Sequence, residues 1–415
     1  MNKFFRRSSF LVLLLVLVLP LSGCWSRREI NQLGFVGSVA IDTVDDSDLL
    51  EVTAQLIRPE AITSGAGGGT AVGGGGSRER VWAVSAKGKT VSDAFSELNT
   101  ISGDYLFFGQ QTSIIIGEEA ARRGVDELLD VFDRLPQLRR TIWVTVTPGR
   151  AKNILETNPK LTGIPSLTIE SLFRYRHENS VAYPSNLNEV MLALSSRSSS
   201  PVAARLTTVS DEGEQDVNGS EIKLEGSGVF KGDQLIGWFN GLETRGLLWI
   251  TEKFKHTILT IAQADELEEK QKYISFYMLT GKRKIHTELK DQKLLIQIKI
   301  TCQANLIEQT GSRDMLSREL KLDQETISSL ESAIASQIKE ETRAVLMKAQ
   351  QYQTDVFGIG ERFYIEHPRQ FKEIQEDWPE LFANAELEIS AAARVRRVGL
   401  INRSINAQIQ EIPGL

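Results

Sequence analysis

Residues 294–304 read LLIQIKITCQA, and this stretch decides the kind of fold that the second half of the chain adopts. Apolar side chains occupy every second position from Leu294 to Ala304, and from Gln297 onward the positions between them are polar. Successive side chains of a β-strand point to opposite faces of the sheet, so the alternation predicts a strand with one buried face. Cys302 stands on the apolar side, where we expect it to pack as a small buried hydrophobic residue.

The segments around this strand extend the pattern. The strand itself is expected at residues 293–306, after three others at 256–261, 271–279 and 283–289. Beyond it, apolar residues recur at spacings of three, four or seven, which predicts one long amphipathic helix: Ile327, Leu330, Ile334, Ile338, Val345 and Tyr352, with Asp323 as the N-cap. We therefore expect a C-terminal β-meander covered by a long helix, followed by short helices at 355–366 and 368–376 and a closing strand at 387–395.

The first 255 residues also combine strands and helices. Strands are expected at residues 33–41, 50–57, 81–85, 106–116, 141–147, 202–210, 221–230 and 234–239. Helices are expected at residues 91–101, 118–134 with a break at Gly124, 151–157, 186–195 and 243–250. Runs of strands and runs of helices are typical of an α+β protein. The predicted fold class is therefore multidomain α+β, with antiparallel or mixed sheets and helices packed on them.

Composition shifts along the chain suggest where its parts begin and end. We expect an N-terminal α+β domain at residues 24–198, a middle β-rich segment or small domain at 199–255, and a C-terminal α+β domain at 256–402, with a tail at 403–415. Residues 65–76 contain eight glycines and almost no side chain to bury, so we expect a mobile surface loop there. No phosphate-binding glycine pattern fits this run.

The first 23 residues have the three parts of a secretory signal. Basic residues open the chain, an apolar run covers residues 10–19, and small residues precede Cys24. Ten helical residues span about 15 Å, against a hydrocarbon core of about 30 Å, which favours a signal peptide over a membrane-spanning helix. The alternative reading of Cys24 is an ordinary cysteine after an ordinary signal peptide.

The last three residues of this signal and the cysteine that follows them, Leu21-Ser22-Gly23-Cys24, closely resemble a bacterial lipobox. The resemblance implies that a diacylglyceryl group is attached to the Cys24 sulfur, that the chain is cut between Gly23 and Cys24, and that the new amine can also be acylated. Two acyl chains hold a protein at a membrane far longer than one. The mature chain would then lie at the outer face of the bacterial membrane, with no cysteine left to pair with Cys302.

Charge and motif content exclude several classes of function. The formal net charge is −6 and the removal of the signal would make it more negative, so nucleic acid is not an expected partner. The four histidines have no metal-binding spacing, and no nucleophile stands in a catalytic motif. We therefore predict no catalytic residue, no metal and no cofactor, and a protein that is not an enzyme.

Five stretches, in order along almost the whole mature chain, together resemble the Ger(x)C family of spore germination lipoproteins. They are residues 24–31 with Ile41-Asp42, residues 106–109, residues 228–249, residues 355–360 and residues 395–400. The resemblance implies a non-enzymatic C subunit of a nutrient germinant receptor with a multidomain α+β fold, tethered outside the spore inner membrane. It further implies work with a polytopic A subunit and a transporter-like B subunit in triggering germination.

Within these stretches, some residue types suit contacts with partner proteins. The partner-interface candidates are Trp238, Arg245, Trp249, Phe357 and Arg396. The aromatic members fit the protein core as well as an interface, and both interpretations stay open at this point. Four glycines of the same stretches are expected at turns or close-packed positions: Gly237, Gly246, Gly358 and Gly360.

A solute-binding lipoprotein that captures a small nutrient directly is the alternative function. Proteins of that class usually have two α/β lobes built from repeated parallel crossover units. The antiparallel pattern and long helix of the second half count against it, and we predict no small-molecule ligand. A ligand-induced rise in thermal stability would separate the two hypotheses.

Overall fold

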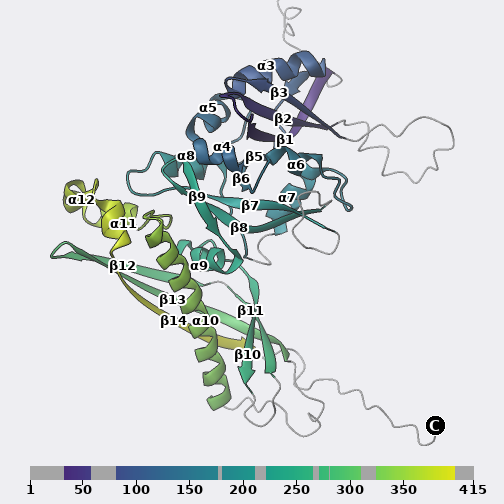
Figure 1. The fold of residues 1–415 in the computed structure, drawn as a ribbon. Coiled ribbons are helices and arrows are strands. Elements are labelled where there is room, and N and C mark those ends of the chain that lie inside the picture. Colours follow the sequence, from purple (N-terminus) through teal and green to yellow (C-terminus); the bar gives the residue numbers. More distant parts are fainter. Residues whose placement is uncertain are drawn as a thin grey trace, which may run out of the picture.

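The computed structural model describes residues 32–57, 81–175, 180–210, 221–264, 271–279, 281–309 and 324–397. Two β-sheets organise these residues, one above the other in Figure 1. Helices pack on both sheets, and the multidomain α+β class predicted from the sequence is confirmed, with both sheets mixed. The predicted Gly-rich loop, the lipobox and the C-terminal tail lie outside the described residues.

The larger sheet contains nine strands from the first part of the chain. Its order is β3 (Val81–Gly88), β2 (Leu50–Ile57), β1 (Leu33–Thr43), β5 (Ser113–Gly117), β6 (Trp143–Thr147), β7 (Val202–Val209), β8 (Glu221–Lys231) and β9 (Gln234–Phe239), with β4 (Tyr105–Phe107) beside one end of β1. The centre, from β1 to β7, is parallel, whereas the strands at both edges pair antiparallel.

Both faces of the larger sheet are covered, which explains why its central strands are apolar at consecutive positions. In β5, Ile114 and Ile116 pack into one core and Ile115 packs into another on the opposite face. The first core is covered by α3 (Val91–Ser102), α4 (Glu118–Arg123), α5 (Asp126–Arg134) and α8 (Leu187–Leu194). The second is covered by α6 (Ala151–Glu156) and α7 (Pro165–Tyr175).

The smaller sheet contains β13 (Lys293–Gln309), the strand predicted around Cys302. Its neighbours are β10 (Thr257–Ala264), β11 (Gln271–Met278), β12 (Lys282–Lys290) and β14 (Glu386–Arg397). In β13, Ile298 and Cys302 are buried on the predicted face. The helix α10 (Gln324–Gln351) contributes Leu330, Ile334 and Ile338 to the same core, as the spacing predicted, and lies along the sheet in Figure 1.

The pairing of β13 refines the predicted meander. Its first half pairs with β12 and its second half with β11, and both lie on the edge of β13 opposite to β14. The strands β11 and β12 therefore follow one another along one edge, and the Leu279 amide between them still donates to the Gln303 carbonyl. The closing strand β14 runs parallel to β13 because a helical crossover separates the two in the chain.

Several element bounds differ from the prediction. The strand expected at 106–116 is two strands, β4 and β5, because a turn that brings the Gln111 amide to the Phe108 carbonyl separates them. The helix expected from residue 355 begins only at α11 (Ile359–Glu366), after a turn held by the Asp355 side chain. The sequence pattern missed α7 and α13 (Trp378–Ala383), whereas α12 (Pro368–Ile374) begins at its proline as expected.

The predicted boundary at residues 198 and 199 stays a prediction. The strands β7, β8 and β9, assigned from the sequence to a middle segment, continue the same sheet as β1 to β6. The helix α9 (Gly241–Thr251) follows directly and packs against α10 of the C-terminal part. The chain between residues 199 and 255 therefore links the larger sheet to the C-terminal core.

Candidate functional site

Motif glycines lie where the larger sheet meets the C-terminal core. A methyl group on Gly246 of α9 would come within 2.8 Å of the Glu341 carbonyl carbon of α10. One on Gly237 of β9 would lie 2.6 Å from the Tyr352 ring. Such separations are too short for any real side chain, so these glycines are close-packing positions, as expected. We call the region where β9, α9, α10 and residues 354–360 meet the joint.

The Asp355 carboxylate organises the turn that enters α11. Its Oδ1 accepts hydrogen bonds from the backbone amides of Phe357 and Ile359, and its Oδ2 accepts from Gly360 at 2.7 Å and from the Trp378 indole at 3.3 Å. The Asp355 backbone carbonyl accepts from the Ser200 amide, which ties the turn to the segment that leads into β7. One buried side chain therefore fixes the whole motif at residues 355–360.

Two ion pairs connect α9 to α10 across the joint. Arg245 binds Glu341 with two parallel hydrogen bonds, of which the Nε–Oε2 bond is 2.9 Å long. Only 11% of the Arg245 side chain and 3% of the Glu341 side chain is exposed. Beside this pair, Lys348 binds both oxygens of Glu243 at 2.7 and 2.9 Å. Charge-assisted, bidentate pairs of this kind fix the relative position of the two helices.

The five partner-interface candidates have different environments. Trp249 and Phe357 are buried in the C-terminal core, and Arg245 is committed to Glu341. Trp238 is half-buried, with the Arg205 guanidinium carbon 5.9 Å from its ring centroid. Arg396 is exposed at the end of β14 and donates to Gln303. The structure thus brings three candidates into the joint or core and leaves Trp238 and Arg396 accessible, so the interface role stays a prediction.

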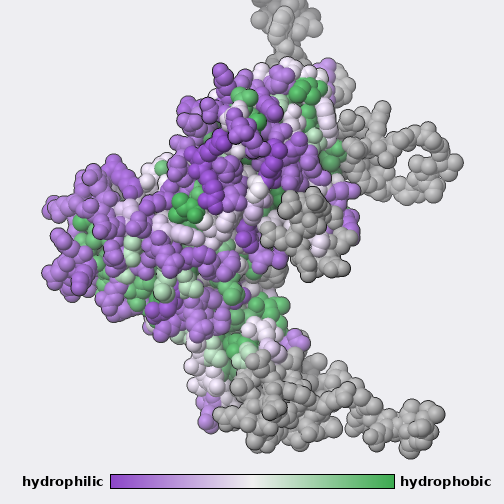
Figure 2. Space-filling model, in the orientation of Figure 1, coloured by the Kyte–Doolittle hydropathy of each residue, from purple (hydrophilic) through white to green (hydrophobic). Residues whose placement is uncertain are grey.

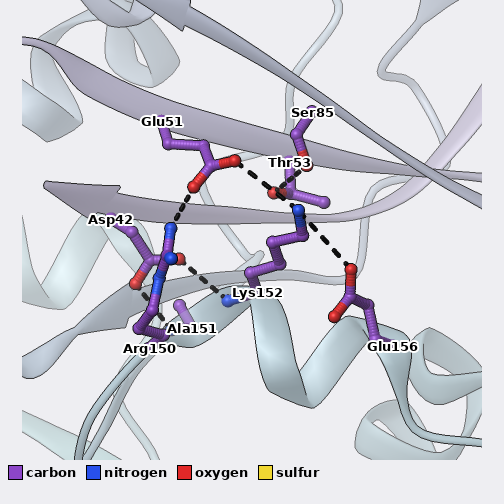
Figure 3. Close-up of polar contacts among 8 residues, drawn as sticks. All are labelled: Asp42, Glu51, Thr53, Ser85, Arg150, Ala151, Lys152 and Glu156. Atoms are coloured by element: carbon purple, nitrogen blue, oxygen red, sulfur yellow. Dashed lines mark hydrogen bonds and ion pairs between the residues drawn. The ribbon is translucent and has the colours of Figure 1, made fainter. Parts of the chain in front are cut away.

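A second buried aspartate stands in the first motif, at Asp42 of β1. Its carboxylate accepts the backbone amides of Ala151 at 2.6 Å and Lys152 at 2.9 Å, at the start of α6 (Figure 3). Burial raises the pKa of Asp42, and these amide hydrogen bonds oppose the rise. Glu51 of β2 binds Arg150 and Lys152 beside it. The aspartate therefore fastens α6 to the sheet, which gives this motif a structural role.

Two hollows border the joint and its neighbouring sheet. The larger, about 700 Å³, lies between α11 and the three strands β12, β13 and β14. The smaller has a volume of about 260 Å³. It is lined by residues of α8 and of the segments before and after it, between positions 183 and 202, together with Thr251, Arg283 and residues 356–358. Arg283 of β12 lines both hollows. Within the described ranges, no group of three or more His, Cys, Asp or Glu side chains is placed to hold a metal ion.

Some site residues could have been found from the sequence. Glu341 lies within the apolar stripe of α10, three residues after Ile338 and four before Val345, so an acid there signals a buried partner. Arg283 is a similar case, because it lies on the buried side of β12 whereas its neighbour Lys284 is exposed on the other side. Neither residue was singled out, because a pattern within one element does not show which side chain of another element faces it.

The predicted lipid-attachment and cleavage residues, Gly23 and Cys24, lie outside the described residues. Among the helices that are described, none is both long and apolar enough to cross a membrane. The visible face of the molecule in Figure 2 is largely hydrophilic, with hydrophobic residues in small separate groups. Some of the exposed hydrophobic residues are in the smaller sheet: Ile258, Tyr273 and Ile307.

Comparisons with known proteins agree along both halves of the chain. Spore germination protein KC of Bacillus subtilis (strain 168) is 24% identical over 98% of this chain and 99% of its own length. Spore germination protein B3 of the same organism is 23% identical over 95% of this chain and 99% of its own length. Spore germination protein A3, also from that organism, is 25% identical over 92% of this chain and 96% of its own length.

The fold agrees with a solved structure. The crystal structure of the GerBC protein matches with a TM-score of 0.53 at 18% identity, over 86% of this chain and 96% of that one. Residues 26–208 match the family model described as the spore germination protein N-terminal domain. Residues 225–399 match the one described as spore germination B3/GerAC-like, C-terminal. On these matches to both halves, the chain belongs to the Ger(x)C family of spore germination proteins.

Proposed function

We propose that this chain is a non-enzymatic subunit of a spore nutrient germinant receptor, required to trigger germination through contacts with polytopic A and B subunits. One observation carries the proposal: relatives named as spore germination proteins match it over nearly their whole length and its own. Matching along both domains favours a shared task over a shared module, since a module would align over one part only.

The membrane attachment of this subunit is part of the proposal. A diacylglyceryl group on Cys24 would hold the chain at the outer face of the spore inner membrane. One acyl chain gives marginal binding, and each further buried methylene adds about 0.8 kcal/mol, so two chains are enough for lasting attachment. Only the seven residues from 25 to 31 would separate this anchor from the described part of the chain, which would keep the larger sheet close to the membrane.

The joint supports a role in transmitting contacts between partners. The buried pair of Arg245 and Glu341 and the turn at Asp355 bind the two parts of the chain to each other. A partner bound at either part would therefore act on a body whose halves are held by specific hydrogen bonds. Trp238 and Arg396, the two accessible candidates, are the motif residues that we propose for partner contacts.

Crosslinking in spores tests the proposal. Spores carrying the anchored chain are treated with a membrane-permeable crosslinker, and its neighbours are identified by mass spectrometry. We expect polytopic A and B subunits among the crosslinked proteins. A photo-crosslinking residue at position 396 should recover one of them, and one at Arg134, exposed on α5 in the other part of the chain, serves as the matched control.

Two results would count against a receptor subunit. If no polytopic subunit is recovered from spores in which the chain is abundant and membrane-bound, the proposed complex is wrong. If germination in response to nutrients is unchanged when the chain is deleted along with any related C subunits, the proposed requirement is wrong.

A further inference from the structure

The larger hollow has an unusual concentration of positive charge. Its lining includes four Lys or Arg residues, namely Arg283, Lys284, Lys299 and Arg362, and a single acid, Glu388. Three isoleucines in register across the sheet border it, Ile285, Ile298 and Ile389, but they are only 1–6% exposed because their side chains pack into the C-terminal core. The exposed side chains of the hollow are polar or charged, and its volume of about 700 Å³ is within the usual range for small-molecule sites.

Arg283 lacks the hydrogen-bond partners that a partly buried guanidinium normally has. Its Nε is buried and has no hydrogen-bond partner among the described residues. The carboxylate paired with it, that of Glu252, stands 3.9 Å from that Nε and is itself half exposed. Burial lowers the pKa of Arg283, and the positive charge of Arg362 lowers it further. A guanidinium offers five N–H donors, so this one has unused capacity to bind an anion.

Arg362 is the second group that an anion could reach. It extends from α11, the helix that borders the hollow, and its Nε binds Glu366 at 3.0 Å on the same helix. That pair is substantially exposed to solvent, at 41% for the arginine side chain and 33% for the glutamate. The interaction with Glu366 uses one edge of the guanidinium, so its other donors are open to a ligand.

We propose that Arg283 and Arg362 bind the carboxylate or phosphate group of a small molecule in the larger hollow. Two guanidiniums from different elements suit such a group, because planar donors match the geometry of carboxylate and phosphate oxygens. An anion between the arginines would also reduce the electrostatic repulsion between the two guanidiniums.

This site does not rest on the proposed receptor function. A receptor subunit and a solute-binding lipoprotein could both use it, and the crosslinking experiment decides between those two roles. The binding experiment asks only whether the arginines hold an anion, so one proposal can fail while the other holds.

Calorimetric titration of the full-length chain with sodium phosphate and with sodium succinate, at constant ionic strength, tests the site. We expect at least one of these probes to bind with a dissociation constant of roughly 1 mM or tighter. The variants Arg283→Gln and Arg362→Gln should each weaken binding at least tenfold. The control is Lys282→Gln, which removes one positive charge from an exposed position of β12 outside the hollow and should bind as the wild type does.

Stability without ligand separates binding from a structural role. If Arg283 serves to bind an anion, Arg283→Gln removes a poorly paired charge, and the unfolding temperature should stay the same or rise. If Arg283 instead supports the fold through Glu252, then Arg283→Gln and Glu252→Gln should lower that temperature by similar amounts, and the proposal is wrong. It is equally wrong if neither probe binds, or if both arginine variants bind them as the wild type does.

Discussion

Removal of Arg245 should destabilise the chain far more than removal of an exposed arginine. In Arg245→Met, the Glu341 carboxylate stays buried, with 3% of its side chain exposed, and keeps only the hydrogen bond from the Gln337 amide at 3.1 Å. Breaking a buried ion pair from one side typically costs about 3–5 kcal/mol, because a charge is left without its partner. With the Gln337 bond retained, we expect about 3 kcal/mol, which is a large part of the stability of an ordinary domain.

The double variant Arg245→Met with Glu341→Met provides the decisive comparison. It removes both charges and replaces them with flexible apolar side chains, so it should recover most of the loss. The exposed pair of Arg134 and Asp130, with 77% and 53% of the side chains exposed, is the matched control. Substitution of Arg134 by Met should barely change the free energy of unfolding.

Urea unfolding followed by tryptophan fluorescence measures these differences, since Trp249 and Trp378 are buried in the same core as the α9–α10 contact. If Arg245→Met loses less than about 1 kcal/mol, or if the double variant is as unstable as the single one, the pair does not hold the joint as described.

Three further predictions concern the same core. Gly246→Ala should lower the free energy of unfolding in urea by about 1–3 kcal/mol, because the added methyl group meets the α10 backbone. The control is Gly241→Ala in the same helix, whose methyl group would lie 3.3 Å from the flexible Glu225 side chain and should be nearly neutral. Equal effects of the two substitutions would contradict the close contact at Gly246. Asp355→Asn should lower the free energy of unfolding by about 1–3 kcal/mol, because an amide group cannot replace all the acceptors of the carboxylate. A variant as stable as the wild type would refute the role of Asp355 in the turn. Burial raises the pKa of the Cys302 thiol to about 12, so this thiol should resist alkylation at pH 8 until urea unfolds the chain. Rapid alkylation of Cys302 in the native protein would contradict its burial.

Periodic patterns were sufficient to predict most of the fold. The alternation around Cys302 and the helical spacing from Leu330 to Val345 correctly gave the buried faces of β13 and α10. Local patterns cannot specify which strands pair when a long strand has partners on both edges. The end-to-end arrangement of β11 and β12 along β13 was therefore missed.

The candidate site was harder to predict for the same physical reason. Trp249 and Phe357 suited an interface or a core equally well as isolated residues, and only the packing of α9 and α11 shows that they are buried. Asp355 was recognised as part of a motif, but its role depends on amides and an indole up to 23 residues away. Contacts between elements, which decide such roles, leave no periodic trace in the sequence.

The most direct test of the account is the replacement of Cys24 by serine in spores that depend on this chain for germination. The serine hydroxyl cannot take the place of the thiol in lipid attachment, so we predict that the variant leaves the membrane fraction and that nutrient-triggered germination is lost. Cys302→Ala, which removes the other thiol of the chain, is the matched control and should stay membrane-bound. A Cys24→Ser protein that remains attached, in spores that respond to nutrients as before, would contradict the lipid-anchored receptor subunit.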